Sequence, residues 1–335
     1  MTFHKLLVYA LAAFVIFMPG CDNHASGGLT DDIELIQTEG FIADRDLLVE
    51  VAEEFYAEHQ DEYDMLVLWG SSEFAPGYSY YLPVTNDVAG IGYEHYGAEC
   101  FNLSSEFSSS RLQGIIWMGP YWNEKLDGLG PESTIGILAQ ETLHRWGAHI
   151  YFYDDNESSL SDGLIGITYH WSFFLDSGAS PLGGNKWEQV DDSLFMTAPV
   201  DYVEFSQIDL YIMGLIEANE VKPVRLLTNV RDENGASYEQ VGRLYKRASV
   251  PLTVTADLVE IPIEKVIEAE GIRNPQAGFN ASEIKQAWIY VYSSSGEPAD
   301  SDLESLKQLQ NQWEDYFNQA SGGRSQIITD LKTER

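Results

Sequence analysis

Two side chains in the stretch LAQETLHRWGAH, residues 138–149, are able to do chemistry together. Glu141 and His144 are three residues apart, so on an α-helix they lie on the same face. A carboxylate and an imidazole placed in this way can bind one metal ion. In a second arrangement the imidazole binds the metal, and the carboxylate acts as a general base on a water molecule. The spacing alone allows either role for Glu141.

The same stretch resembles the helix of H-E-x-x-H zinc proteases. In those enzymes two histidines four residues apart bind zinc, and the glutamate beside the first histidine activates water. Gln140 stands where the first histidine of that motif would be. A glutamine offers a neutral amide oxygen, whereas zinc prefers imidazole, thiolate or carboxylate ligands. The substitution therefore predicts weaker zinc binding unless another ligand replaces the missing imidazole.

Two further histidines are candidates for the missing ligand. His170 belongs to a later segment, YHWSFF, and a catalytic zinc ion needs about three protein ligands. His149 follows Gly147, a glycine that we expect to end the helix and to let the chain turn back. We therefore predict that His144 and His170 hold zinc, with Gln140 or His149 completing the set of ligands.

A simpler explanation exists for each of these side chains. A histidine among aromatic residues, such as His170, is often a packed core residue, and a surface or capping position is expected for His149 before a ligand role. Asp176 follows His170 along the chain and is a candidate to orient an imidazole. Convergence of His144 and His170 in space would separate a metal site from scattered residues.

Three segments together resemble a group of bacterial secreted proteins with a zincin-like core. The segments are QETLHRWGAH (140–149), HWSFFLDSGASPLGGN (170–185) and FSQIDLYIMGL (205–215), and the resemblance extends over most of residues 45–325. The group consists of predicted metallopeptidases. The resemblance therefore implies a mixed sheet with an active-site helix, zinc as cofactor, and protein or peptide substrates. Leu182 departs from a metzincin-like site, because it stands where the methionine of the Met-turn would lie.

The N-terminus predicts export and a lipid anchor. Residues 1–20 contain Lys5, then an apolar run, then a small residue, Gly20, directly before Cys21. The run is too short to cross a bilayer comfortably, and its flanks are typical of a signal peptide. The pattern resembles the lipobox of bacterial lipoproteins, which implies a lipid on Cys21 and a tether over residues 21–40. The alternative is an ordinary signal peptide with a chance cysteine.

This anchor would place the protein in the bacterial cell envelope, attached to a membrane and facing the periplasm or the exterior. A lipidated Cys21 leaves Cys100, the second cysteine, without an intramolecular disulfide partner. We expect Cys100 to be a small buried apolar residue.

The overall composition indicates a folded and strongly acidic protein. The 335 residues are 44% hydrophobic and 13% aromatic, enough to bury a substantial core. The formal net charge is −34, which argues against a duplex nucleic-acid partner, since such affinity comes mainly from Lys and Arg neutralising phosphates. The charge is more simply explained by solubility.

The pattern of apolar residues predicts an α+β fold, with a zincin-like core over residues 41–221 and a C-terminal α+β region over residues 222–335 packed on it. The core reads as a helix over 44–59, a buried strand over 63–70, further strands, and the helix that begins at Ser133 or Thr134. Residues 302–323 predict an amphipathic helix with one apolar stripe, formed by Leu303, Leu306, Leu309, Trp313 and Phe317. The segment 205–215 fits a helix or a strand equally well.

Two functions follow from these observations. The first is a membrane-anchored lipoprotein with zinc-dependent peptidase activity on extracytoplasmic proteins or peptides, with Glu141 as catalytic base. The second is an inactive zincin-like relative that keeps the fold and serves as a binding or envelope-associated protein; Gln140 is the main argument for it. A purely structural envelope protein would instead leave Gln140, Glu141, His144 and His170 scattered in the fold.

Overall fold

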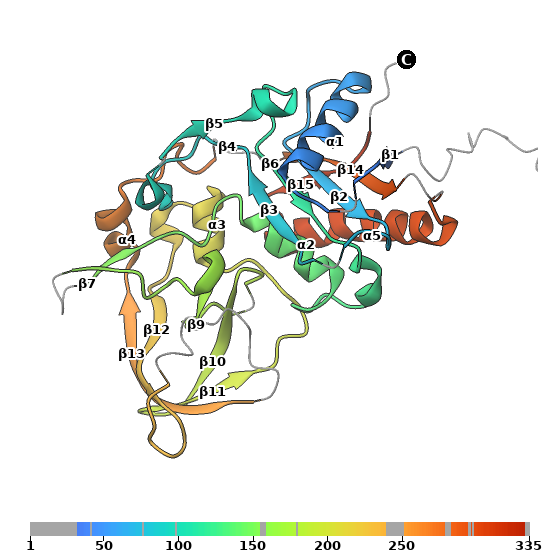
Figure 1. The fold of residues 1–335 in the computed structure, drawn as a ribbon. Coiled ribbons are helices and arrows are strands. Elements are labelled where there is room, and N and C mark those ends of the chain that lie inside the picture. The colour runs from blue at the N-terminus through green and yellow to red at the C-terminus, as the bar shows by residue number, and fades with distance from the viewer. Residues whose placement is uncertain are drawn as a thin grey trace, which may run out of the picture.

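Figure 1 shows the computed structural model of the chain, which describes residues 32–331 apart from positions 41, 76, 98, 155–158, 179, 239–250, 279–282, 294, 295 and 297. The predicted signal peptide, Cys21 and the first part of the predicted tether lie outside the described residues. The structure has mixed α and β content, as the sequence predicts.

The main sheet brings together strands from both ends of the chain. Its order is β1 (Glu34–Thr38), β14 (Glu283–Ser293), β2 (Met65–Gly70), β6 (Gly114–Trp117) and β3 (Tyr80–Pro83), and β15 (Gln326–Ile328) also pairs with β14. Neighbouring strands are parallel except at the edge, where β3 runs antiparallel to β6. Every residue of β2 is buried, which confirms the buried strand predicted from its continuous apolar run.

Helices cover both faces of this sheet. Alternate residues of a strand point to opposite faces, so Leu66 and Leu68 pack with α1 (Arg45–Glu58), while Met65 and Val67 face the second core. The second core contains apolar side chains from α2 (Thr134–Leu143) and α5 (Asp300–Ala320). The sheet is therefore a shared middle layer, and α2 lies between it and the rest of the molecule (Figure 1).

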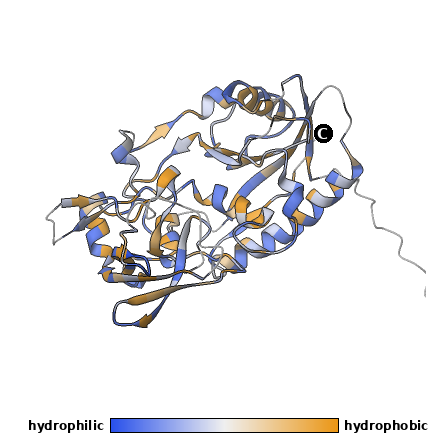
Figure 2. Cartoon of the chain, turned by 60° about the horizontal axis from the view of Figure 1, so that its bottom comes forward, coloured by the Kyte–Doolittle hydropathy of each residue, from blue (hydrophilic) through white to orange (hydrophobic). Residues whose placement is uncertain are grey.

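The C-terminal helix α5 confirms the amphipathic pattern seen in the sequence. All five residues of the predicted stripe are buried, including Leu306 and Trp313, which are fully buried. Figure 2 shows hydrophilic and hydrophobic residues alternating along this helix. Its apolar side thus packs on the core while its polar side faces solvent.

A closed five-stranded barrel forms the other half of the structure. Its order is β10 (Gly183–Asp191), β11 (Leu194–Ala198), β13 (Thr253–Ile261), β12 (Val224–Arg231) and β9 (Trp171–Asp176). Two helices alternate along the chain with the strands of the barrel: α3 (Gln207–Met213) precedes β12, and α4 (Ile263–Glu270) follows β13. The ambiguous segment 205–215 therefore contains a helix, and Ser206 begins it with a capping box to Asp209.

Short elements join these layers. They are β4 (Thr85–Asn86), β5 (Phe101–Asn102), β7 (Phe152–Asp154), β8 (Ser159–Ser161), and the 3₁₀ turns η1 (Tyr93–Tyr96), η2 (Ser104–Phe107), η3 (Trp122–Lys125), η4 (Ile167–Tyr169) and η5 (Ala218–Glu220). Within the described part of the chain, no helix has the length and apolar character needed to cross a membrane.

One local expectation differs from the structure. Cys100 is exposed and not buried, because it lies in the polar loop between η1 and β5, beside Glu99. The region after residue 222 contributes β14 to the interior of the main sheet and two strands to the barrel. It therefore shares its sheets with the preceding region.

Candidate functional site

Helix α2 carries the residues of the protease-like motif. It begins at Ser133, whose hydroxyl oxygen accepts a hydrogen bond from the backbone N–H of Gly136 at 3.0 Å. The helix ends at Leu143, and His144 is its C-cap. The expected end at Gly147 is wrong by one turn, because the N–H of Trp146 bonds back to Leu143 in a tighter turn.

The structure brings His144 and His170 together. Their ring centroids are 4.7 Å apart, and the rings are perpendicular. His170 reaches this position from the segment between η4 and β9, so its ring meets the end of α2 from the barrel side. The predicted convergence of two imidazoles separated in sequence is therefore present.

Backbone carbonyl groups fix the orientation of both imidazoles. Nδ1 of His144 lies 3.1 Å from the carbonyl oxygen of Gly147. Nδ1 of His170 lies 3.3 Å from the carbonyl oxygen of Ile167 and 3.0 Å from the hydroxyl of Thr168. A carbonyl oxygen only accepts, so Nδ1 carries the proton in each ring and Nε2 carries the lone pair. This tautomer is the one in which an imidazole binds a metal through Nε2.

The charge state of His144 is also suited to binding a cation. Burial, together with the neighbouring His170, lowers the pKa of His144 to about 3, so its ring is neutral at physiological pH. A neutral imidazole is the form that acts as a metal ligand.

The chain before His170 is held in an unfavourable conformation. Thr168 and Tyr169 have φ angles of 54° and 60°, which is the left-handed region that side chains with a Cβ rarely adopt. The carbonyl oxygen of Tyr169 accepts a hydrogen bond from the N–H of Ala148 at 2.8 Å. Local strain of this kind persists where the surroundings hold a residue in place, and it is common at functional sites.

Glu141 is buried against the sheet edge. It is 3% exposed, and its Oε1 accepts a hydrogen bond from Nε2 of Gln140 at 3.0 Å. Burial raises the pKa of Glu141 to about 7, although Gln140 and the backbone N–H of Tyr81 in β3 act in the opposite direction. The amide of Gln140 therefore donates to the carboxylate that a protease would use as its base.

His149 is buried, so the expected surface position is wrong, and its charge would act on the pKa of His144, but the three imidazoles do not form a group with ligand atoms within 4.8 Å of one another. Its ring lies 4.5 Å from the Tyr93 ring and 5.0 Å from the Tyr169 ring, measured between centroids. Burial lowers its pKa to about 3. Leu182 is fully buried, and a Cβ added to Gly147 would meet its side chain. Leu182 therefore packs under the turn that follows α2.

Asp176 does not orient either imidazole. It forms an ion pair with Arg225, and its Oδ1 accepts a hydrogen bond from the N–H of Trp187 at 3.1 Å. The expectation for Asp176 is wrong because β9 continues away from His170 before it reaches this residue, so that Asp176 faces β10 and β12.

The structure also contains a cluster that the sequence did not predict. Glu94, His95 and Glu270 each offer a ligand atom within 4.8 Å of the others. Among the described His, Cys, Asp and Glu residues this is the one group of three with such spacing, and Glu141 does not complete one with His144 and His170. The neighbours Glu94 and His95 were the available signal, but nothing in the sequence points to Glu270.

Comparison of the chain with models of protein families, with curated proteins and with solved structures found no match.

Proposed function

We propose that this protein is a membrane-anchored lipoprotein of the bacterial envelope with a zinc-dependent peptidase site at the end of α2. The overall architecture that the proposal assumes is zincin-like, with α2 as the active-site helix beneath a mixed sheet. Lipidation of Cys21 belongs to the same proposal and rests on the sequence alone.

The observation that carries the proposal is the paired presentation of His144 and His170. The two rings lie 4.7 Å apart between centroids, and Nδ1 of each ring is hydrogen-bonded to a backbone carbonyl oxygen. This leaves the lone pair of each Nε2 to bind a metal ion. Zinc–nitrogen bonds of about 2.1 Å require the two nitrogens to lie within about 4 Å, which this ring separation permits. The residues present therefore fit a zinc ion.

Each residue then has a distinct role. Nε2 of His144 and of His170 would hold the ion, while the carbonyl oxygens of Gly147 and Ile167 keep both rings oriented. Glu141, on the same helical turn as His144, accepts the proton of the attacking water and passes it to the leaving amine. A bound zinc ion would supply a Lewis acid for a peptide carbonyl.

The second candidate is an inactive relative that binds without cutting. Two observations favour it. The amide of Gln140 donates a hydrogen bond to Oε1 of Glu141, so this oxygen already has a partner, and position 140 has no imidazole. Two imidazoles without a third charged or imidazole ligand predict weaker zinc binding than a three-ligand site. The two candidates differ in zinc content and in the effect of changing Glu141.

The decisive experiment measures zinc content and peptide hydrolysis for the wild type and for four variants. Replacing either imidazole, by His144→Phe or His170→Gln, should abolish zinc binding at this site. Glu141→Gln should keep the zinc but lose hydrolysis. His59→Gln is the control, because His59 lies elsewhere, stacked on Phe55 with ring centroids 4.3 Å apart.

A gain-of-function variant sharpens the test. Gln140→His would restore two imidazoles four residues apart on α2, so we expect the zinc affinity to rise by about 100-fold or more. Zinc that stays with the His144→Phe/His170→Gln protein at full peptidase activity would refute the assignment. Absence of hydrolysis in zinc-loaded wild type and in zinc-loaded Gln140→His would favour the binding protein.

A further inference from the structure

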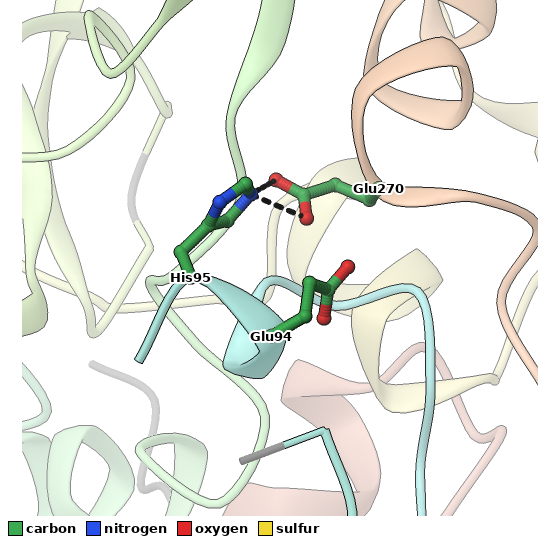
Figure 3. A group of neighbouring side chains, drawn as sticks. All are labelled: Glu94, His95 and Glu270. Atoms are coloured by element: carbon green, nitrogen blue, oxygen red, sulfur yellow. Dashed lines mark hydrogen bonds and ion pairs between the residues drawn. The ribbon is translucent and has the colours of Figure 1, made fainter. Parts of the chain in front are cut away.

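We propose that Glu94, His95 and Glu270 form a second binding site, for a divalent transition-metal ion such as Zn²⁺. This site is separate from the histidine pair of α2 and shares no ligand with it. Figure 3 shows its three side chains converging from two parts of the chain, η1 and the end of α4.

The geometry already resembles a set of ligands. Nε2 of His95 lies 3.1 Å and 2.9 Å from the two carboxylate oxygens of Glu270. Glu94 adds a carboxylate oxygen, and one ligand atom of each residue lies within 4.8 Å of the other two. The side chain of Glu270 is completely buried, whereas that of His95 is 20% exposed, so an ion can enter past the imidazole.

Two carboxylate side chains meet here beside one imidazole. Glu270 is the last residue of α4, and the C-terminal end of a helix carries a partial negative charge that disfavours a carboxylate. One carboxylate oxygen of Glu94 lies within 4.8 Å of one of Glu270. A cation bound between the two carboxylates would offset their mutual repulsion.

A second observation points to a missing partner. Oε2 of Glu94 is buried, and no donor group of the described residues hydrogen-bonds to it. Buried carboxylate oxygens are normally paired, since an unpaired one costs free energy. A divalent ion would supply the partner that this oxygen lacks among the described residues.

The ligand set indicates which ions fit. One imidazole nitrogen with two carboxylates suits Zn²⁺ and its transition-metal neighbours, while Ca²⁺ prefers oxygen ligands throughout. The backbone N–H of Tyr151 donates to Glu270, and the Tyr151 ring lies 4.0 Å from the His95 ring between centroids. A bound ion would thus clamp η1 and α4 to the segment that follows His149.

The test uses the full chain purified in detergent, with the α2 site removed by His144→Phe or, independently, by His170→Gln. Zn²⁺ is titrated calorimetrically, and Co²⁺ is used as a visible-absorption probe of imidazole ligation. We expect about one equivalent of Zn²⁺ to remain bound in both backgrounds. Adding His95→Gln or Glu94→Gln should weaken that binding by more than about tenfold and should remove the Co²⁺ bands of the site.

Glu99→Gln is the matched control, because it removes the same charge from an exposed position in the loop that follows η1. The inference is overturned if neither background retains Zn²⁺, or if Glu99→Gln weakens binding as much as Glu94→Gln. Ca²⁺ binding as tight as Zn²⁺ binding would overturn the choice of metal. These outcomes are independent of the peptidase, because the α2 site is absent throughout.

Discussion

Two glycines that flank the same turn allow a controlled test of how η1 packs. Gly92 and Gly97 bound η1 on either side, and both have positive φ angles, 94° and 78°. They differ in the space around them. A Cβ at Gly92 would lie 2.2 Å from the carbonyl oxygen of His149, whereas a Cβ at Gly97 would meet nothing within 4 Å.

The expected losses of stability follow from this difference. An alanine in the left-handed region costs about 1 kcal/mol at either position. At position 92 the new methyl group also overlaps main chain that has no rotamer to move, and overpacking of this kind typically costs about 1–3 kcal/mol more. Gly92→Ala should therefore lower the free energy of unfolding by about 2–4 kcal/mol, against about 1 kcal/mol for Gly97→Ala.

Urea unfolding followed by tryptophan fluorescence measures the difference. With a slope of about 3 kcal/mol/M, an extra loss of about 2 kcal/mol separates the two midpoints by about 0.7 M. EDTA should be present throughout, so that metal binding does not contribute to stability. Equal midpoints for Gly92→Ala and Gly97→Ala would show that η1 does not pack against His149 as described, and would refute the reasoning.

Three further changes have defined outcomes. Asp209→Asn should lower the free energy of unfolding by about 2–3 kcal/mol, because the buried carboxylate accepts hydrogen bonds from Trp171 and from the Ser206 backbone, and an amide cannot accept all of them; chemical denaturation measures this. Cys21→Ser should move the protein from the membrane fraction to the soluble fraction, as tested by fractionation and immunoblotting. Burial acts to raise the pKa of Asp61, but hydrogen bonds from Ser109 and Ser110 outweigh it and hold the pKa below the usual 3.8. The ionised carboxylate of Asp61 therefore stabilises the fold above pH 3.8, and this stabilisation is lost as the pH falls through the folded-state pKa. Asp61→Asn should lower the free energy of unfolding by about 1 kcal/mol or less at pH 7 and by still less at pH 3, as measured by urea unfolding.

Local patterns in the sequence were sufficient for several elements. The apolar run of β2 and the stripe of α5 both identify buried surface, because burial repeats with the period of the element. The cap at Ser133 marks the start of α2 for the same local reason. The sequence does not decide between a helix and a strand for the segment that forms α3, because its apolar residues are too closely spaced to show a period.

Local patterns do not predict which residues meet when they are far apart in the sequence. The meeting of His144 with His170 was predicted from the types of residue that zinc requires, and the structure places their rings in contact. Glu270 reaches His95 across the whole sequence between η1 and α4, and no spacing rule links them. The prediction that Asp176 orients an imidazole is wrong, because a short distance from His170 along the chain does not determine the direction in which β9 runs.

The place of β14 has a consequence for how the chain acquires its shape. This strand, residues 283–293, lies between β1 and β2, which come from residues 34–38 and 65–70. A polypeptide that emerges N-terminus first has no partner to join those two early strands until its final fifth has appeared. Closing such a large loop is slow, so β1 and the edge of β2 that pairs with β14 stay unpaired until then. Helper proteins that shield exposed apolar segments would have their longest engagement during that interval.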